Sequence, residues 1–176
     1  MTAAAENAAA TPITALGRKL RTRAELKDIL ARERAAGKTI VLANGCFDLL
    51  HGGHVSYLEG ARALGDVLVV GLNSDASMRA LKGTGRPVYP ETWRAELLAA
   101  MSAVDYIVIF DEPTCDALLE ELRPHVHAKG TDYTAQTVPE RETARRCGIR
   151  THIAGAPKEN STKDIIRAII EKHEAS

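Results

Sequence analysis

Residues 39–66, TIVLANGCFDLLHGGHVSYLEGARALGD, indicate most clearly which fold this chain is expected to adopt. This stretch opens with an apolar run typical of a buried strand, passes through a glycine-bearing bend with two histidines, and continues in a helical pattern. A strand that leads directly into a helix is the first half of a parallel βαβ unit. The sequence HGGH, residues 51–54, therefore lies where a strand passes into a helix, which raises the question of its chemical role.

The same alternation of strand and helix continues along the chain. Apolar runs of strand length predict five strands, at residues 39–44, 66–73, 105–110, 125–129 and 149–155. Helical patterns separate them at residues 54–64, 91–104, 114–122 and 139–148, and a last helix is expected after Ser161. Residues 74–90 are interpreted as a loop. We therefore predict one Rossmann-like, doubly wound α/β domain over residues 39–173, built on a five-stranded parallel sheet.

A helical extension is expected before the first strand. Residues 1–12 form an alanine-rich tail with little to bury, so we expect them to be disordered. Residues 13–38 contain a capping-box pattern at Thr22 and Glu25 and a stop at Gly37. Apolar residues follow at helical spacing: Leu26, Ile29 and Leu30.

Two later helices carry apolar residues at helical spacing, which indicates faces that pack on the core. One face comprises Trp93, Leu97, Met101 and Val104. The other comprises Ile165, Ile166, Ile169 and Ile170. We interpret both as core positions rather than as parts of a binding site.

Composition limits the possible partners. Among 176 residues, 23 basic and 23 acidic side chains cancel, so no overall field attracts the chain to nucleic acid or to an anionic membrane. Three cysteines, Cys46, Cys115 and Cys147, without a CxxC pair argue against a disulfide framework and indicate a reducing cytosol. The N-terminus lacks the pattern of a signal peptide, and no apolar run reaches the ~20 residues that cross a bilayer. A cytoplasmic location is expected.

The HGGH segment has features of a phosphate-binding site. Gly52 and Gly53 let the backbone approach a ligand, and the helix that begins near His54 directs unpaired N–H groups and partial positive charge toward it. His51 and His54 add imidazoles that can donate hydrogen bonds to phosphoryl oxygens. A zinc pair lacks further ligands at customary spacing, so no protein-bound metal is predicted, and a glycine turn with incidental histidines is the remaining alternative. The GxGxxG and P-loop motifs are absent.

Four motifs in order carry a family resemblance. The stretch from Asn44 to Asp66 resembles the HxGH signature of the nucleotidylyltransferase superfamily. With NSD at 73–75, KGTGRPV at 82–88, KGTDY at 129–133 and ST at 161–162, the chain closely resembles bacterial ADP-heptose synthase adenylyltransferases from about Thr39 to Ile170. HxGH alone would indicate only the superfamily, whereas the combination is much more specific.

The resemblance implies an adenylyl transfer in which D-glycero-β-D-manno-heptose 1-phosphate attacks the α-phosphorus of ATP and pyrophosphate leaves. The attacking phosphate is already ionised, so catalysis rests on positioning and on neutralising charge. The implied catalytic residues are His51, His54, Lys82 and Arg94. A lysine in a mobile loop and an arginine exposed on its helix are the structural alternatives for the last two.

The resemblance also assigns binding residues. Those implied to bind the nucleotide are Asn44, Gly45, Cys46, Phe47, Gly53, His54, Lys129, Gly130, Asp132, Ser161 and Thr162. Those implied to bind the sugar phosphate are Asp48, Asn73, Asp75, Lys82 and Arg86. Asp48 is alternatively a turn-forming residue, and Ser161 with Asp164 is a capping-box pattern compatible with phosphate binding.

Further implications concern cofactor and partners. Mg²⁺ is expected to be held mainly by the triphosphate, a separate sugar kinase should supply the 1-phosphate, and a homodimer is implied by the resemblance alone. One departure is that Glu159 and Asn160 precede the ST pair, where relatives usually carry glycine and a small or apolar residue, and Lys158 could offset the added acid. Cys46 is expected to be small and buried, with no role for its thiol.

Several histidines and cysteines fall outside these motifs and are interpreted as structural. They are Cys115, Cys147, His125, His127, His152 and His173.

Two other functions stay open at this point. A cytidylyltransferase for glycerol 3-phosphate or another polyol phosphate would use the same motifs, because base choice depends on contacts that sequence does not reveal. A regulatory protein that binds nucleotide without turnover would keep the fold but would not need charge aimed at pyrophosphate. A redox Rossmann domain is excluded by the missing glycine fingerprint and the missing acidic residue after it.

Overall fold

The computed structural model describes residues 15–157 and 161–174, so the alanine-rich tail at residues 1–12 and the departure at residues 158–160 lie outside the described residues. The five strands are β1 (Ile40–Gly45), β2 (Val67–Asn73), β3 (Tyr106–Phe110), β4 (Val126–Gly130) and β5 (Arg150–Ala154). The helices are α1 (Ala15–Lys19), α2 (Arg23–Ala35), α3 (Gly52–Arg62), α4 (Asp75–Lys82), α5 (Glu91–Ala100), α6 (Asp116–Leu122), α7 (Arg141–Arg146) and α8 (Thr162–Glu174). The predicted strands are all present, and no end is shifted by more than one residue.

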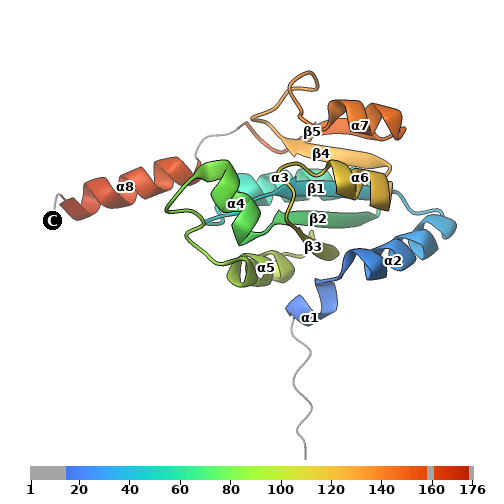
Figure 1. The fold of residues 1–176 in the computed structure, drawn as a ribbon, viewed down its shortest axis with the longest axis horizontal. Coiled ribbons are helices and arrows are strands. Elements are labelled where there is room, and N and C mark those ends of the chain that lie inside the picture. The colour runs from blue at the N-terminus through green and yellow to red at the C-terminus, as the bar shows by residue number, and fades with distance from the viewer. Residues whose placement is uncertain (1–14, 158–160, 175–176) are drawn as a thin grey trace, which may run out of the picture.

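The sheet is wholly parallel and has the order β3-β2-β1-β4-β5 (Figure 1). The chain builds outward from β1 to β3, then returns to place β4 on the other side of β1. The order of strands therefore reverses between β1 and β4, where open α/β sheets bind ligands beyond the carboxyl ends of their strands. The prediction of a doubly wound α/β fold with five parallel strands is confirmed.

Helices cover both faces of the sheet, and each face has its own apolar core. Side chains of α3 and α5, with parts of α1, pack on one face, while α2, α6 and α7 pack on the other. Neighbouring strand residues alternate between the two cores: Val41 contributes to the first and Leu42 to the second. This alternation explains why the central strands read as continuous apolar runs.

The cap of the helix α2 forms where the sequence predicts it. Thr22 caps α2 in a reciprocal capping box with Glu25, and Gly37 adopts the left-handed backbone conformation just after the helix, with φ +78°. The expected loop at residues 74–90 is partly wrong, because residues 75–82 form α4. Ser74 caps that helix by accepting a hydrogen bond from the Ser77 N–H. The side chain of Met78, within the helix, is buried.

The predicted core face of α5 is partly wrong. Val104 is buried, but Trp93 and Leu97 are 57% and 41% exposed. The helix instead turns Arg94 and Leu98 inward, together with two alanines. Small residues allow α5 to lie close to the sheet, and the arginine is tolerated inside because backbone and carboxylate oxygens surround it.

The isoleucine stripe of α8 does not enter the core either. Ile165 and Ile166 are half-buried, whereas Ile169 and Ile170 are 59% and 50% exposed. Figure 1 shows why, because α8 extends away from the sheet instead of packing on a face of it. Helical periodicity reports which residues share a face, not what that face contacts. No helix in the described ranges has the length and apolar character to span a membrane.

Candidate active site

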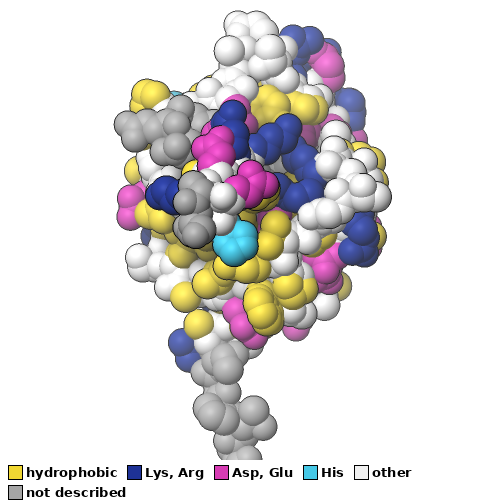
Figure 2. Space-filling view, turned by 90° about the vertical axis from the view of Figure 1, so that its left-hand side faces the viewer, with side chains coloured by type: hydrophobic (Ala, Val, Ile, Leu, Met, Phe, Trp, Pro, Cys, Tyr) yellow, Lys and Arg dark blue, Asp and Glu magenta, His cyan; other side chains and the backbone are white. Residues whose placement is uncertain are grey.

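The functional segments meet at the end of the sheet where the strands finish. The bend after β1, the helix α4 after β2, the segment after β4 and the start of α8 after β5 all lie at this end (Figure 1). Figure 2 views the molecule from this side and shows lysine and arginine side chains grouped above the centre, with hydrophobic side chains below. Acidic side chains lie among the basic ones, so the charge at this end of the sheet is mixed.

The bend after β1 has an unusual backbone. Phe47 and Leu49 both adopt the left-handed conformation, with φ 49° and 47°, which non-glycine residues rarely do. Between them Asp48 turns inward and is only 2% exposed. Such conformations persist only where surrounding contacts hold them, and they concentrate at functional sites.

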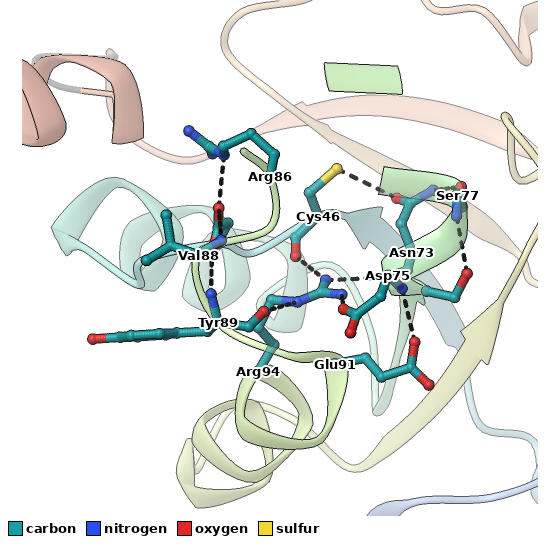
Figure 3. A network of polar contacts seen from close by, with 11 residues as sticks. Cys46, Asn73, Asp75, Ser77, Arg86, Val88, Tyr89, Glu91 and Arg94 are labelled. Atoms are coloured by element: carbon teal, nitrogen blue, oxygen red, sulfur yellow. Dashed lines mark hydrogen bonds and ion pairs between the residues drawn. The ribbon is translucent and has the colours of Figure 1, made fainter. Parts of the chain in front are cut away.

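Asp48 supplies those contacts by joining three segments. Its carboxylate forms an ion pair with Arg86 Nε at 2.8 Å and accepts hydrogen bonds at 3.1 Å from the backbone N–H groups of Val88 and Tyr89 (Figure 3). Its backbone oxygen accepts a hydrogen bond from Thr162 Oγ1 at the start of α8. Asp48, which is implied by the resemblance to bind the sugar phosphate and is alternatively a turn-forming residue, orders the loop in this structure.

The HGGH segment places two imidazoles at the N-terminus of α3. The helix begins at Gly52, two residues earlier than expected, because His51 is its cap: its Nδ1 accepts a hydrogen bond from the Gly53 N–H at 3.1 Å. Neutral His51 must therefore carry its proton on Nε2. The rings of His51 and His54 lie 4.0 Å apart, and Phe47 packs against His54 at 5.4 Å.

Arg94 is not the exposed helix residue considered as an alternative, because it is fully buried. Its guanidinium donates to the backbone oxygens of Cys46, Asn73 and Tyr89 and forms a 2.7 Å ion pair with Asp75 (Figure 3). It connects the ends of β1 and β2 to the segment before α5. In this structure its donors are engaged by the protein, which supports a positioning role rather than direct contact with phosphate.

Other predicted residues at the end of β2 also have internal partners. Asn73 is buried, and its amide donates to Ser77 Oγ at 3.0 Å. The pKa of the Cys46 thiol is raised by burial, although the positive charges of Lys82 and Arg94 act to lower it. Lys82 is exposed at the end of α4, within electrostatic range of the bend. Cys46 is half-buried rather than fully buried as expected.

The predicted nucleotide residues on the β4 side differ in their exposure. Lys129 is 5% exposed and pairs with Glu140 at 3.3 Å, while Asp132 is exposed. The Lys129 ammonium also donates to Asn44 Oδ1 at 3.2 Å, across the point where strand order reverses. Sequence reasoning missed Glu140, because nothing local to it indicates that it meets a lysine eleven positions earlier.

The start of α8 combines capping with a tether to the bend. Ser161 and Asp164 bond reciprocally, as the capping-box pattern predicts. Thr162, next along the chain, uses its hydroxyl for the bond to Asp48. The structure thus brings the ST pair to the same end of the sheet as HGGH.

Two grooves border this region, and Arg86 lines both. One, of about 370 Å³, lies along α8, and its lining includes the basic residues Lys163 and Arg167. The other, of about 400 Å³, lies between α4 and the segment before α5 and includes Asp75 and Arg79. Within the described ranges, the terminal nitrogens of Arg86 form no hydrogen bond, since its ion pair uses Nε.

An all-parallel sheet of this order, with a helix N-terminus and two imidazoles at the reversal of strand order, is an arrangement of nucleotide-binding α/β proteins. Residues 42–170 match the model of the family described as cytidylyltransferase-like, so the chain belongs to that family and contains a nucleotidyltransferase domain.

Two curated proteins and one solved structure are similar to most of this chain. The chain is 50% identical over 156 residues to "Bifunctional protein HldE" of Syntrophotalea carbinolica and 48% identical over 155 residues to that of Pelobacter propionicus. These matches cover 89% and 88% of the chain but 32% of each relative, so the chain spans about a third of their length. A solved lipopolysaccharide core biosynthesis protein from Thermoplasma volcanium GSS1 is 29% identical with TM-score 0.58, covering 70% of this chain and all of that one.

Proposed function

We propose that this chain is an adenylyltransferase that transfers AMP from ATP to D-glycero-β-D-manno-heptose 1-phosphate, giving ADP-heptose and pyrophosphate for lipopolysaccharide core or related glycan synthesis. The observation that carries the proposal is the start of α3, where His51 caps the helix and the ring of His54 lies 4.0 Å away. Similarity to the HldE proteins supports the proposal in family terms, and the choice of substrates rests on the motif resemblance.

The chemistry asks the protein for positioning and charge rather than for a base. A phosphate oxygen of the sugar attacks the α-phosphorus of ATP, the bond from that phosphorus to the bridging oxygen breaks, and pyrophosphate leaves. The partial positive charge at the start of α3 and the Nε2–H of His51 can act on the oxygens on which charge increases. His54 and Lys82 complete the set that we propose to act on the phosphates.

Magnesium fits this site as a companion of the triphosphate. The two carboxylates nearest the bend are already paired with cations, Asp48 with Arg86 and Asp75 with Arg94. Neither pair leaves a carboxylate free of a cationic partner for a protein-held ion, whereas Mg²⁺ commonly binds through substrate phosphates and keeps several waters. When bound, the ion would neutralise charge on the departing pyrophosphate.

The sugar phosphate is proposed to enter beside Arg86. That residue borders both grooves, and its terminal nitrogens suit bidentate contact with a phosphate. Asp75 lines the second groove and is paired with Arg94, so it would act by holding the groove's shape. A sugar kinase, in the same polypeptide or in another, would supply the 1-phosphate, and a homodimer remains part of the proposal.

Pyrophosphate release with magnesium tests the function directly. ATP or CTP is paired in turn with heptose 1-phosphate and with glycerol 3-phosphate, and products are identified by mass. ADP-heptose formed from ATP alone is the expected result. CDP-glycerol would establish the cytidylyltransferase alternative, which the family description favours, and tight ATP binding without turnover on any pair would establish a regulatory binding protein.

A further inference from the structure

A buried polar cluster lies behind the bend, between β1 and β4. Lys129 Nζ and His127 Nε2 both approach Asn44 Oδ1, at 3.2 Å and 3.1 Å. Glu140 pairs with Lys129 at 3.3 Å and accepts a hydrogen bond from the Cys115 N–H. His127 and Cys115 are fully buried, and the proposed reaction assigns no role to either of them or to Glu140.

The hydrogen-bonding capacities of these groups fix the orientation of the Asn44 amide. An ammonium can only donate, so the Asn44 atom facing Lys129 must be the carbonyl oxygen. His127 Nε2 lies against the same oxygen and must therefore carry a proton. The NH₂ end of Asn44 then faces away from both residues, and within the described ranges it forms no hydrogen bond.

Charge within the cluster agrees with this arrangement. Burial, aided by the Lys129 ammonium, lowers the pKa of His127 to about 4, so the ring is neutral with its proton on Nε2. Burial acts to raise the pKa of Glu140, but attraction to the Lys129 ammonium, helped by backbone hydrogen bonds, outweighs it, so the pKa is lowered and the carboxylate stays ionised. Cys115, His127 and Glu140 lie within 4.8 Å of one another, yet a protonated Nε2 and a neighbouring ammonium disfavour a cation among them.

We propose that His127, Lys129 and Glu140 are positioning residues that hold the Asn44 side-chain amide with its NH₂ group directed at an acceptor atom of the bound nucleotide. Lys129 then acts through Asn44 and not by touching the nucleotide itself. This inference rests on the proposed function only in requiring that a nucleoside triphosphate binds at the end of β1.

A double-mutant cycle tests whether Lys129 affects nucleotide binding through Asn44 or by direct contact with the nucleotide. Mg–ATP binding to the full chain is measured by calorimetry for wild type, Asn44→Ala, Lys129→Met and the double variant. Loss of the amide donor should weaken binding about tenfold. If Lys129 acts through Asn44, adding Lys129→Met to Asn44→Ala should weaken it no more than about twofold further. Multiplying effects would overturn the proposal. Lys27→Met, exposed on α2, is the matched control and should bind as wild type.

Lys129→Met leaves the Glu140 carboxylate buried without its cation, so a charge-balanced variant guards against loss of folding. Lys129→Met with Glu140→Gln removes both charges, and thermal unfolding verifies that it folds. The same cycle with Asn44→Ala should give the same coupling. Independent additive losses in this background would also contradict the proposal.

The tautomer of His127 gives a readout that does not depend on activity. Two-dimensional ¹⁵N–¹H spectra at pH 7 should show its Nε2 protonated and Nδ1 unprotonated. An Nδ1–H tautomer would overturn the proton assignment and with it the role of His127 in holding the Asn44 amide. If the protein makes ADP-heptose but the losses of ATP affinity in the Asn44 and Lys129 variants are additive, only this inference is refuted. If the folded wild-type protein binds neither ATP nor CTP, the proposed function is refuted as well.

Discussion

Thr162 Oγ1 donates a 2.7 Å hydrogen bond to the backbone oxygen of Asp48, across 114 positions of sequence. The same aspartate holds the segment before α5 through Arg86 and two backbone N–H groups. Three motifs that are far apart in the chain therefore meet on one buried residue. The bend that carries HGGH is held in place from both sides.

Asp48→Asn tests that junction. The new NH₂ group would face backbone N–H groups or Arg86 Nε, all of which are donors. At least one hydrogen bond or ion pair would therefore be replaced by two donor groups that face each other. We expect a loss of about 2–3 kcal/mol in the free energy of unfolding in urea, together with weaker nucleotide binding. Asp28→Asn, exposed on α2, is the control. An unchanged unfolding midpoint for the Asp48 variant would show that the junction is not needed.

His54→Ala should separate catalysis from folding. Losing one preorganised donor to a transition-state charge lowers turnover by about 100-fold or more. His54 is half-buried, so the unfolding transition should shift little. Turnover is measured as pyrophosphate release, with His152→Ala, exposed on β5, for comparison. Near-normal turnover in a folded His54→Ala protein would remove His54 from the catalytic set.

Arg94→Met should act mainly on stability. Removing a fully buried guanidinium leaves the Asp75 carboxylate and three backbone oxygens without their donor, which costs about 3–5 kcal/mol. Arg94→Lys should restore little, because a single ammonium cannot reach acceptors that a planar fork spans. Chemical denaturation measures both. A variant as stable as wild type but with reduced turnover would return Arg94 to the directly catalytic role.

The lowered pKa of His127 predicts how the free energy of unfolding depends on pH. Its pKa is about 4 in the folded protein against 6.5 ordinarily, so the unfolded chain binds the proton more tightly. The free energy of unfolding should therefore fall by about 1.4 kcal/mol per pH unit from pH 6.5 toward 4 and be insensitive to this residue above 6.5. Glu140, with its pKa also lowered, adds a loss only below its ordinary value of 4.5. His127→Leu should flatten the upper part of the slope, and an unaltered slope would argue that His127 titrates normally.

The two faces of α5 can be compared by substitution. Trp93→Ala, at a 57% exposed site, should change the free energy of unfolding by no more than about 0.5 kcal/mol, whereas Leu98→Ala should cost about 2–5 kcal/mol. Trp93 is the chain's single tryptophan, so its fluorescence should be quenched readily by acrylamide. A protected, blue-shifted emission would support the original assignment of Trp93 to the core.

From the amino-acid sequence alone, the class of fold, the order of the strands along the chain and most of the helices could be predicted, although the helix α4 was expected to be a loop. These follow from local signals: apolar runs of strand length, helical spacing, and caps such as Thr22 with Glu25. Such signals act within a few residues, so they can be read along the chain.

The contacts that the site's side chains make depend on the three-dimensional fold. Arg94 is buried because oxygens from three separate segments surround it, and Lys129 faces Asn44 because β4 returns beside β1. Likewise, Trp93 and the isoleucines of α8 share helical faces that the sequence reveals, but whether a face is covered depends on what packs against it. Contacts between distant segments arise from the fold as a whole, and no local pattern encodes them.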